Sequence, residues 1–189
     1  MISVWWDPLN VLPRGRGLIW LTLAVGVSFL QGPSFLESFR PAPDEGVDFF
    51  QEWSSAKSFF DKKSIYSRHS ETVPKYLGFA VKHEPHRDAI QIKVDVNAHP
   101  PPSVFLALPF SRLDYPNAVL AWNSISIVML VVSLRWLVRK LAIPCRAWSV
   151  FPAITILLLS NPLRQQVNQG QLGSLFLLLL LSNWMASRS

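Results

Sequence analysis

The chain has 189 residues, of which 50% are hydrophobic and only 16% are charged, and it contains 8 Trp and 12 Phe. Because the apolar residues occur in blocks, this composition predicts a membrane protein rather than a soluble domain. The net charge is +6, and the basic residues Arg14, Arg16 and those from Arg135 to Arg146 lie beside apolar blocks, as cytoplasmic anchors do, which argues against nucleic acid as a partner. The single cysteine, Cys145, excludes an intramolecular disulfide and a cysteine-based metal site.

The first apolar block, Leu18–Leu30, follows the basic sequence PRGRG. It is short for a membrane span and resembles the core of a signal peptide. No clear A-x-A cleavage site follows, and Phe35, Leu36 and Phe39 can continue a helix past Gly32-Pro33 with a kink. We therefore expect an uncleaved anchor, with residues 1–17 as a cytoplasmic tail and residues 18–39 as the first transmembrane helix.

Residues 40–101 form the long polar part of the chain and carry a predicted amphipathic helix at 46–62. Its apolar positions recur at spacings of three and four, and the two acids lie one turn apart on the opposite side, where like charges repel. An acid so placed at a membrane surface could take a proton from a hydroxyl, or the acids could simply solvate the outer face of an interfacial helix. The predicted apolar face is Phe49, Phe50, Trp53, Ala56 and Phe60, and the polar side is Asp48, Glu52 and Ser55.

A short strand is expected at Ala89–Ala98, where apolar and polar residues alternate. The segment that follows it, 102–113, is interrupted by Pro109 and is expected to be re-entrant or broken rather than a regular span.

The remaining blocks predict three more transmembrane helices. If 102–113 does not cross, Arg14 and Arg16 share the cytoplasmic side with the later basic residues, as the positive-inside rule favours. The fold class is then an all-α polytopic membrane protein with a long external loop that carries an amphipathic helix. The predicted segments are transmembrane helices at 118–134, 147–160 and 172–186, a basic cytoplasmic loop at 135–146 and an external polar loop at 161–171.

The polar connection Asn161–Gly173 is rich in groups that can bind a ligand. Arg164 can contact a phosphate, and Asn168 and Gln171 belong to a series of side-chain amides. Gly170 lets a ligand approach the backbone where the last helix begins. A hydrated turn, with glutamines that keep it out of lipid, is an equally good interpretation.

His99 precedes three prolines, which place its imidazole on a stiff lead-in to the next segment. It could orient a substrate or stabilise a phosphate, although an interfacial structural residue is the simpler interpretation. The sequence His83-Glu84-Pro85-His86 contains metal-ligand types, but Pro85 prevents the regular helix that would put them on one face. No nucleotide-binding or nucleophile-elbow motif occurs, so we predict no metal and no cofactor.

In order along the chain, these elements resemble glycosyltransferase family 87, the DUF2029 group of polytopic GT-C transferases. The resemblance covers roughly residues 17–186, and its individual elements are short dipeptides and tripeptides whose order and spacing carry it. His99 stands where the family usually has tyrosine. The matching elements are Asp48-Phe49, Ile65-Tyr66, His99-Pro100-Pro101, Pro109, Ala121-Trp122 and Gly170-Gln171.

The resemblance implies a multi-pass enzyme of the cell membrane, most simply the bacterial plasma membrane, with membrane lipids around it. Such an enzyme would move a hexose, by analogy mannose, from a polyprenyl-phosphate-sugar donor to a lipid or glycan acceptor on the external face. Asp48 stands at the position of the family's general base. Glu52, His99, Arg164, Asn168, Gly170 and Gln171 are the expected substrate-binding residues.

Family members are about twice as long as this chain and have more spans. We therefore expect the chain to correspond to the N-terminal part of such an enzyme, which would need its C-terminal half as a partner for activity. The alternative is a small non-catalytic membrane protein whose external loop binds a partner or a lipid. A transporter fragment is less favoured, because the predicted spans carry no charged residue at their centres.

Overall fold

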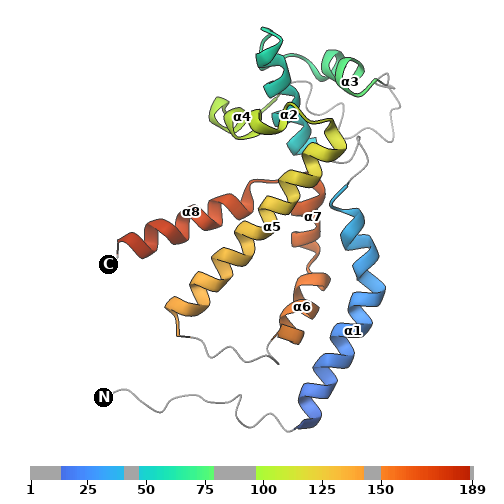
Figure 1. The fold of residues 1–189 in the computed structure, drawn as a ribbon, viewed down its shortest axis with the longest axis vertical. Coiled ribbons are helices and arrows are strands. Elements are labelled where there is room, and N and C mark those ends of the chain that lie inside the picture. Colours follow the sequence, from blue (N-terminus) through green and yellow to red (C-terminus); the bar gives the residue numbers. More distant parts are fainter. Residues whose placement is uncertain (1–13, 41–46, 79–96, 143–149, 188–189) are drawn as a thin grey trace.

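A computed structural model describes residues 14–40, 47–78, 97–142 and 150–187, and within these ranges the chain is helical with no strand (Figure 1). The predicted all-helical class is therefore confirmed for this part of the chain. The strand expected at 89–98 falls almost wholly on 79–96, outside the described residues. The helices are α1 Arg14–Glu37, α2 Val47–Phe60, α3 His69–Leu77, α4 Pro101–Ala107, the 3₁₀ turn η1 Leu108–Phe110, α5 Tyr115–Lys140, α6 Val150–Leu159, α7 Asn161–Gln169 and α8 Gly173–Ala186.

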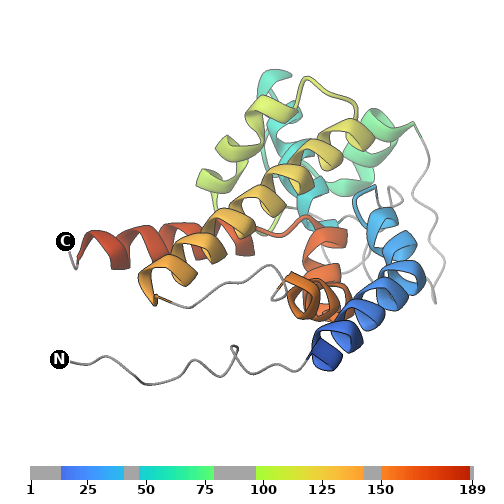
Figure 2. The same cartoon turned by 60° about the horizontal axis from the view of Figure 1, so that its bottom comes forward.

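The long helix α5 connects two regions of different character. At its N-terminal end it meets the short helices α2, α3 and α4, which gather on one side of the molecule (Figure 1). Its remaining length runs away from them, in the same general direction as α1 (Figures 1 and 2). Helix α1 packs against α6, α8 packs against α5, and α2 packs against α4, α5, η1 and α7. The short helices thus form one end of the molecule, and the long apolar helices form the other.

Two helices are long and apolar enough to cross a membrane, judged by length and composition: Gly17–Glu37 and Tyr115–Lys140. The second has 26 residues, which at 1.5 Å per residue is about 39 Å against roughly 30 Å of hydrocarbon. Within the described ranges, helices α6 and α8 have 10 and 14 residues, fewer than the roughly 20 of an upright span.

The boundaries of the two long helices differ from the predicted ones. Helix α1 begins four residues earlier than expected, at Arg14, and passes through Pro33 to Glu37. Helix α5 includes Arg135–Lys140, which we had expected in a cytoplasmic loop. Arginine and lysine are good helix formers, and basic residues in a last turn interact favourably with the helix dipole, so the basic segment extends the helix.

The predicted polar loop at 161–171 was wrong in its secondary structure, because the structure has the nine-residue helix α7 there. The Ser160 hydroxyl caps its start by accepting a hydrogen bond from the backbone of Leu163, and Pro162 lies in the first turn, where its missing N–H costs nothing. Gly170 ends the helix in the left-handed conformation, with φ of 66°. These are ordinary helix start and stop signals that the polar composition obscured.

Helix α2 is buried on nearly every side, not on one face. Phe49, Phe50, Trp53 and Ala56 are buried as predicted, and the aromatic rings pack with Tyr115 and Trp122 of α5. The predicted outer face was wrong, because Glu52 and Ser55 are each only 3% exposed. Phe60, placed on the apolar face by its spacing, is 54% exposed because the helix ends there. Neighbouring helices therefore cover the polar side of α2 as well as its apolar side.

Candidate functional site

A cavity of about 820 Å³ lies between α2, the segment that leads into α4, and the start of α8. Acidic, imidazole, hydroxyl and amide groups line one part of it, and leucine and phenylalanine side chains line the rest. A cavity with both kinds of wall suits an amphiphilic molecule better than a purely polar one. Its lining residues are Asp48, Glu52, His99, Pro100, Pro102, Ser103, Leu106, Gly170, Gln171, Leu172, Gly173, Leu175, Phe176 and Leu179.

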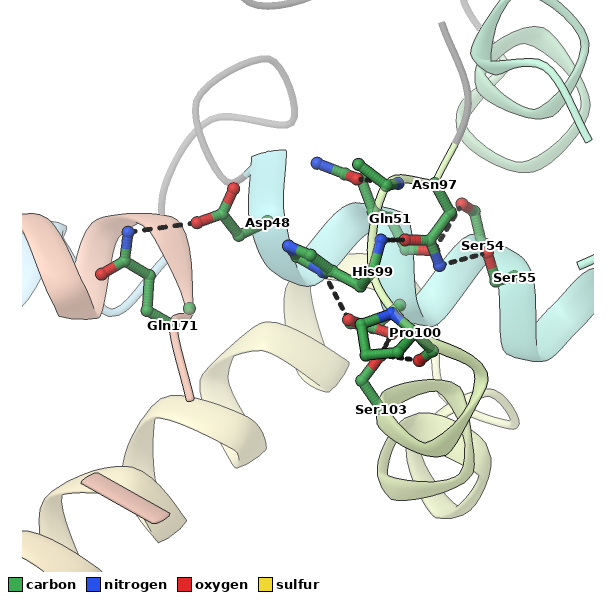
Figure 3. Close-up of polar contacts among 12 residues, drawn as sticks. Asp48, Gln51, Ser54, Ser55, Asn97, His99, Pro100, Ser103 and Gln171 are labelled. Atoms are coloured by element: carbon green, nitrogen blue, oxygen red, sulfur yellow. Dashed lines mark hydrogen bonds and ion pairs between the residues drawn. The ribbon is translucent and has the colours of Figure 1, made fainter. Parts of the chain in front are cut away.

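Asp48 and Gln171, which are 123 residues apart in sequence, meet in this cavity (Figure 3). The Gln171 amide donates a hydrogen bond from Nε2 to Asp48 Oδ2 at 3.1 Å, and it is itself held by Gln169 Oε1 at 2.8 Å. Asp48 lies in the first turn of α2 and is half-buried. Within the described part of the chain, its other oxygen, Oδ1, accepts no hydrogen bond, so it can accept one from a ligand.

Gly170 makes this meeting possible by its lack of a side chain. A Cβ built on Gly170 would lie 2.5 Å from Cβ of Phe49 and 3.4 Å from Cδ1 of Trp122. The Gly170 carbonyl also accepts a hydrogen bond from Trp122 Nε1 at 2.8 Å. The turn after α7 is therefore fixed against α2 and α5 at a distance that only glycine permits.

Glu52 lies one turn after Asp48 but has a different environment. It is buried, and both of its oxygens have partners: Oε1 lies 2.5 Å from Nδ1 of His99, and Oε2 accepts a hydrogen bond from the Ser103 hydroxyl at 2.8 Å. The two acids of α2 are thus distinct: Asp48 has an oxygen open to the cavity, whereas Glu52 organises the residues around it.

Hydrogen bonds from backbone and side-chain amide groups hold the segment that carries His99 against α2 (Figure 3). Asn97 donates through Nδ2 to the Ser55 hydroxyl at 2.8 Å, and its Oδ1 accepts from the backbone N–H of His99 at 2.8 Å. The backbone N–H of Ala98 donates to Gln51 Oε1 at 3.1 Å. Gln51, Ser55, Asn97 and Ser103 were not predicted as site residues. For Gln51 and Ser55 the available signal was the unusual density of polar residues within the aromatic helix α2, whereas Asn97 and Ser103 lie outside that helix.

The structure separates the predicted substrate-binding residues into two groups. Glu52, His99, Gly170 and Gln171 line the cavity together with Asp48, whereas Arg164 and Asn168 do not. These two lie one turn apart on α7. Helix α7 contributes no residue to the lining of the cavity, which begins at Gly170 after the helix ends.

No group of three His, Cys, Asp or Glu side chains within the described ranges is placed to hold a metal ion. The His83–Asp88 group lies outside those ranges.

Comparison with known protein families finds a match for the second part of the chain. Residues 97–189 match the family model of glycosyltransferase family 87. This range, just under half of the chain, is similar to that family. No curated protein and no solved structure matches the chain. The family similarity suggests a glycosyltransferase, and the two long apolar helices suggest a membrane protein.

The family 87 match contributes only some of the cavity. It includes His99, Ser103, Gly170 and Gln171, whereas Asp48 and Glu52 lie before its first residue. The tertiary structure is what joins the two acids to the family 87 segment.

Proposed function

We propose that this chain forms the N-terminal part of an integral-membrane, GT-C type glycosyltransferase, with Asp48 as its general base. It would transfer a hexose, by analogy mannose, from a polyprenyl-phosphate donor to a hydroxyl of a lipid or glycan acceptor. The observation that carries this proposal is the contact between Asp48 and Gln171 in a cavity that the family 87 segment helps to form.

The reaction assigns Asp48 one proton transfer. As the acceptor hydroxyl loses its proton to Asp48, its oxygen forms a bond to the anomeric carbon of the sugar. The bond from that carbon to the donor phosphate breaks, and its electron pair leaves with the phosphate, so the configuration inverts. The open Oδ1 of Asp48 can receive the proton while Gln171 holds Oδ2. Glu52 is unsuited to the role because both of its oxygens are already bonded.

The apolar wall of the cavity supports a lipid-linked substrate. Leu106 of α4 and Leu175, Phe176 and Leu179 of α8 continue from the polar groups along the same cavity. An isoprenoid chain would cover these side chains while its phosphate and sugar lay near Asp48. This is the arrangement that an amphiphilic donor requires.

The charge distribution supports an external position for this cavity. Helix α5 begins beside α2 and ends in a basic turn with Arg139 and Lys140, and the basic start of α1 lies at that same end of the molecule (Figure 1). Under the positive-inside rule that end is cytoplasmic, so the short helices and the cavity lie on the external side.

Asp48→Asn tests the proposal. We would compare membranes that contain this variant with membranes that contain the wild-type protein, with radiolabelled polyprenyl-phosphate mannose as the donor. We expect transfer to fall by about 10²- to 10⁴-fold, because the amide cannot accept the hydroxyl proton. Asp114→Asn is the matched control: Asp114 is exposed at the start of α5, and its side chain makes no capping hydrogen bond there. Transfer that survived Asp48→Asn at the level of this control would remove Asp48 as the base.

A further inference from the structure

His99 is held by one nitrogen and presents the other to the cavity. Its Nδ1 lies 2.5 Å from the buried Glu52, and its side chain is 34% exposed. Figure 3 shows the imidazole between the segment that precedes α4 and the start of α2, with its second nitrogen directed to the side of Asp48. With Nδ1 engaged by a carboxylate, Nε2 is the atom left to contact a ligand.

The other side-chain donors of the cavity are already in use. The Ser103 hydroxyl lies within hydrogen-bond distance of both Glu52 and the Pro100 carbonyl, at 2.8 and 2.7 Å. The Gln171 amide donates to Asp48 and Gln169. No lysine or arginine is among the described residues that line the cavity. An anionic ligand group would therefore find its available side-chain donor at His99.

We propose that His99 contacts the phosphate of the lipid-linked donor through Nε2–H, and that Glu52 is the positioning residue that holds the imidazole for this contact. The inference rests on the proposed function and adds to it the residue that contacts the leaving group. As the bond between the sugar and the phosphate breaks, negative charge grows on the departing oxygen, and a fixed N–H donor stabilises that charge. No proton needs to be transferred from His99, because the electron pair stays on the phosphate.

The spacing of the two acids agrees with this division of roles. Glu52 follows Asp48 by four residues on one helix, a rise of about 6 Å. Asp48 is thus at one end of the polar part of the cavity, and the histidine that Glu52 holds is displaced along it by about one helical turn. In an inverting displacement the base and the leaving group lie on opposite sides of the reacting carbon. Two separated polar groups are what this geometry needs.

Ligand binding without turnover tests the inference. We would measure the Kd of polyprenyl phosphate and of the matching polyprenol, which lacks the phosphate, for the protein in lipid nanodiscs. The wild type should bind the phosphate at least about tenfold more tightly than the alcohol, which corresponds to one charge-assisted hydrogen bond. His99→Asn keeps a donor near the Nδ1 position and loses the one at Nε2, so the ratio of the two Kd values should fall toward one.

His99→Gln is the second variant, because its longer side chain can place an amide N–H near the Nε2 position. It should keep more of the Kd ratio than His99→Asn. Since both ligands are measured on the same protein, partial unfolding would weaken both and leave the ratio unchanged. A ratio in His99→Asn equal to that of the wild type would overturn the inference. So would competition by inorganic phosphate as strong as that by polyprenyl phosphate, because the site would then bind free phosphate.

Glu52→Gln tests the positioning role through kinetics. It should raise the KM for the donor or lower kcat while leaving the acceptor KM unchanged, in the same pattern as His99→Asn but with a smaller amplitude. Glu71→Gln is the control for loss of a carboxylate, because Glu71 is an exposed acid in the first turn of α3. A change in both KM values together would indicate a general structural role and would remove Glu52 as a positioning residue.

The two proposals can fail separately. A wild type that discriminates the phosphate but transfers no sugar would remove the transferase function and keep the phosphate contact. Sugar transfer together with an unchanged Kd ratio in His99→Asn would do the reverse.

Discussion

Helices α2 and α8 form facing walls of one cavity, and their burial is the opposite of what their sequences suggest. Helix α2 carries two acids, a glutamine and several serines, yet Glu52, Ser54, Ser55 and Ser58 are buried. Helix α8 is rich in leucine, yet its side chains Phe176, Leu179 and Leu180 are more than half exposed and Ser174 is its buried residue.

The difference follows from the solvent that each helix meets. Lipid chains are as apolar as leucine, so a leucine-rich helix in a membrane gains little by burial against protein. Polar groups gain much from protein partners, because a buried polar group without a hydrogen bond is costly. In this protein, hydrogen bonds between polar groups and packing of aromatic rings stabilise the interior, while apolar side chains of helices such as α8 are exposed at the surface.

The largest effect on stability is expected where these two regions meet, at Gly170. Gly170→Ala would put a Cβ 2.5 Å from Phe49 and would force alanine into a left-handed backbone conformation with φ of 66°. We expect a loss of roughly 3 kcal/mol in the free energy of unfolding, from strain and overpacking together. Thermal or denaturant unfolding in detergent would measure it.

Gly78→Ala is the matched control for this change. Gly78 also has a positive φ, 78°, but nothing lies within 4 Å of its missing Cβ. It should lose only the backbone part, on the order of 1 kcal/mol. Equal losses of unfolding free energy at the two glycines would contradict this prediction. They would show that the contact between Gly170 and Phe49 leaves room for a Cβ.

A direct comparison of the two helices comes from one truncation on each. Ser55→Ala removes a hydroxyl that donates to the Ile65 carbonyl at 2.6 Å and accepts from Asn97 at 2.8 Å. The change takes this donor from the Ile65 carbonyl and leaves Asn97 Nδ2 with its longer hydrogen bond to the Gln51 carbonyl, at 3.4 Å. The loss should be roughly 1–3 kcal/mol. Leu180→Ala removes a larger apolar group that is 68% exposed on α8, and in a bilayer its loss should be below about 1 kcal/mol. A reversed order would contradict the view that polar contacts hold the interior.

The smallest effect is expected at an exposed polar contact outside the cavity, between α2 and α3. Asp61 forms an ion pair with Lys75 and accepts a hydrogen bond from Tyr76 at 2.8 Å. The Lys75 hydrogen bond, more than any other contact, lowers the pKa of Asp61 below its usual 3.8, and its bond to Asp61 raises the pKa of Lys75 above 10.5.

The pH dependence of this contact follows from those two directions. Its contribution to folding stability is complete between pH 3.8 and 10.5. On the acid side it is lost as pH falls through the lowered pKa of Asp61. On the alkaline side it is lost as pH rises through the raised pKa of Lys75. Asp61→Asn should therefore change the melting temperature only slightly at pH 7, because the pair is exposed. Its difference from the wild type should shrink further in acid. A difference that grew below pH 3.8 would contradict this assignment.

Local patterns predicted the helices better than their surroundings. The aromatic spacing in α2 identified Phe49, Phe50 and Trp53 as buried, and the apolar blocks located α1 and α5. Patterns failed where a residue's partner lies far away in sequence. Glu52 was assigned to an outer face because periodicity defines opposite sides of a helix but not what covers each side. The 161–171 segment was taken for a loop because its polar composition outweighed the helix signals at Ser160 and Gly170.

By itself, the sequence determined an all-helical chain with membrane-like apolar blocks and a resemblance to family 87, because these depend on residue order and local periodicity. The tertiary structure decided which polar residues share a cavity: it joined Asp48 to Gln171, paired Glu52 with His99, and left Arg164 outside. Such contacts depend on how helices from distant parts of the chain pack. The sequence shows that residue 170 is a glycine, but only the tertiary structure shows that it lies against Phe49.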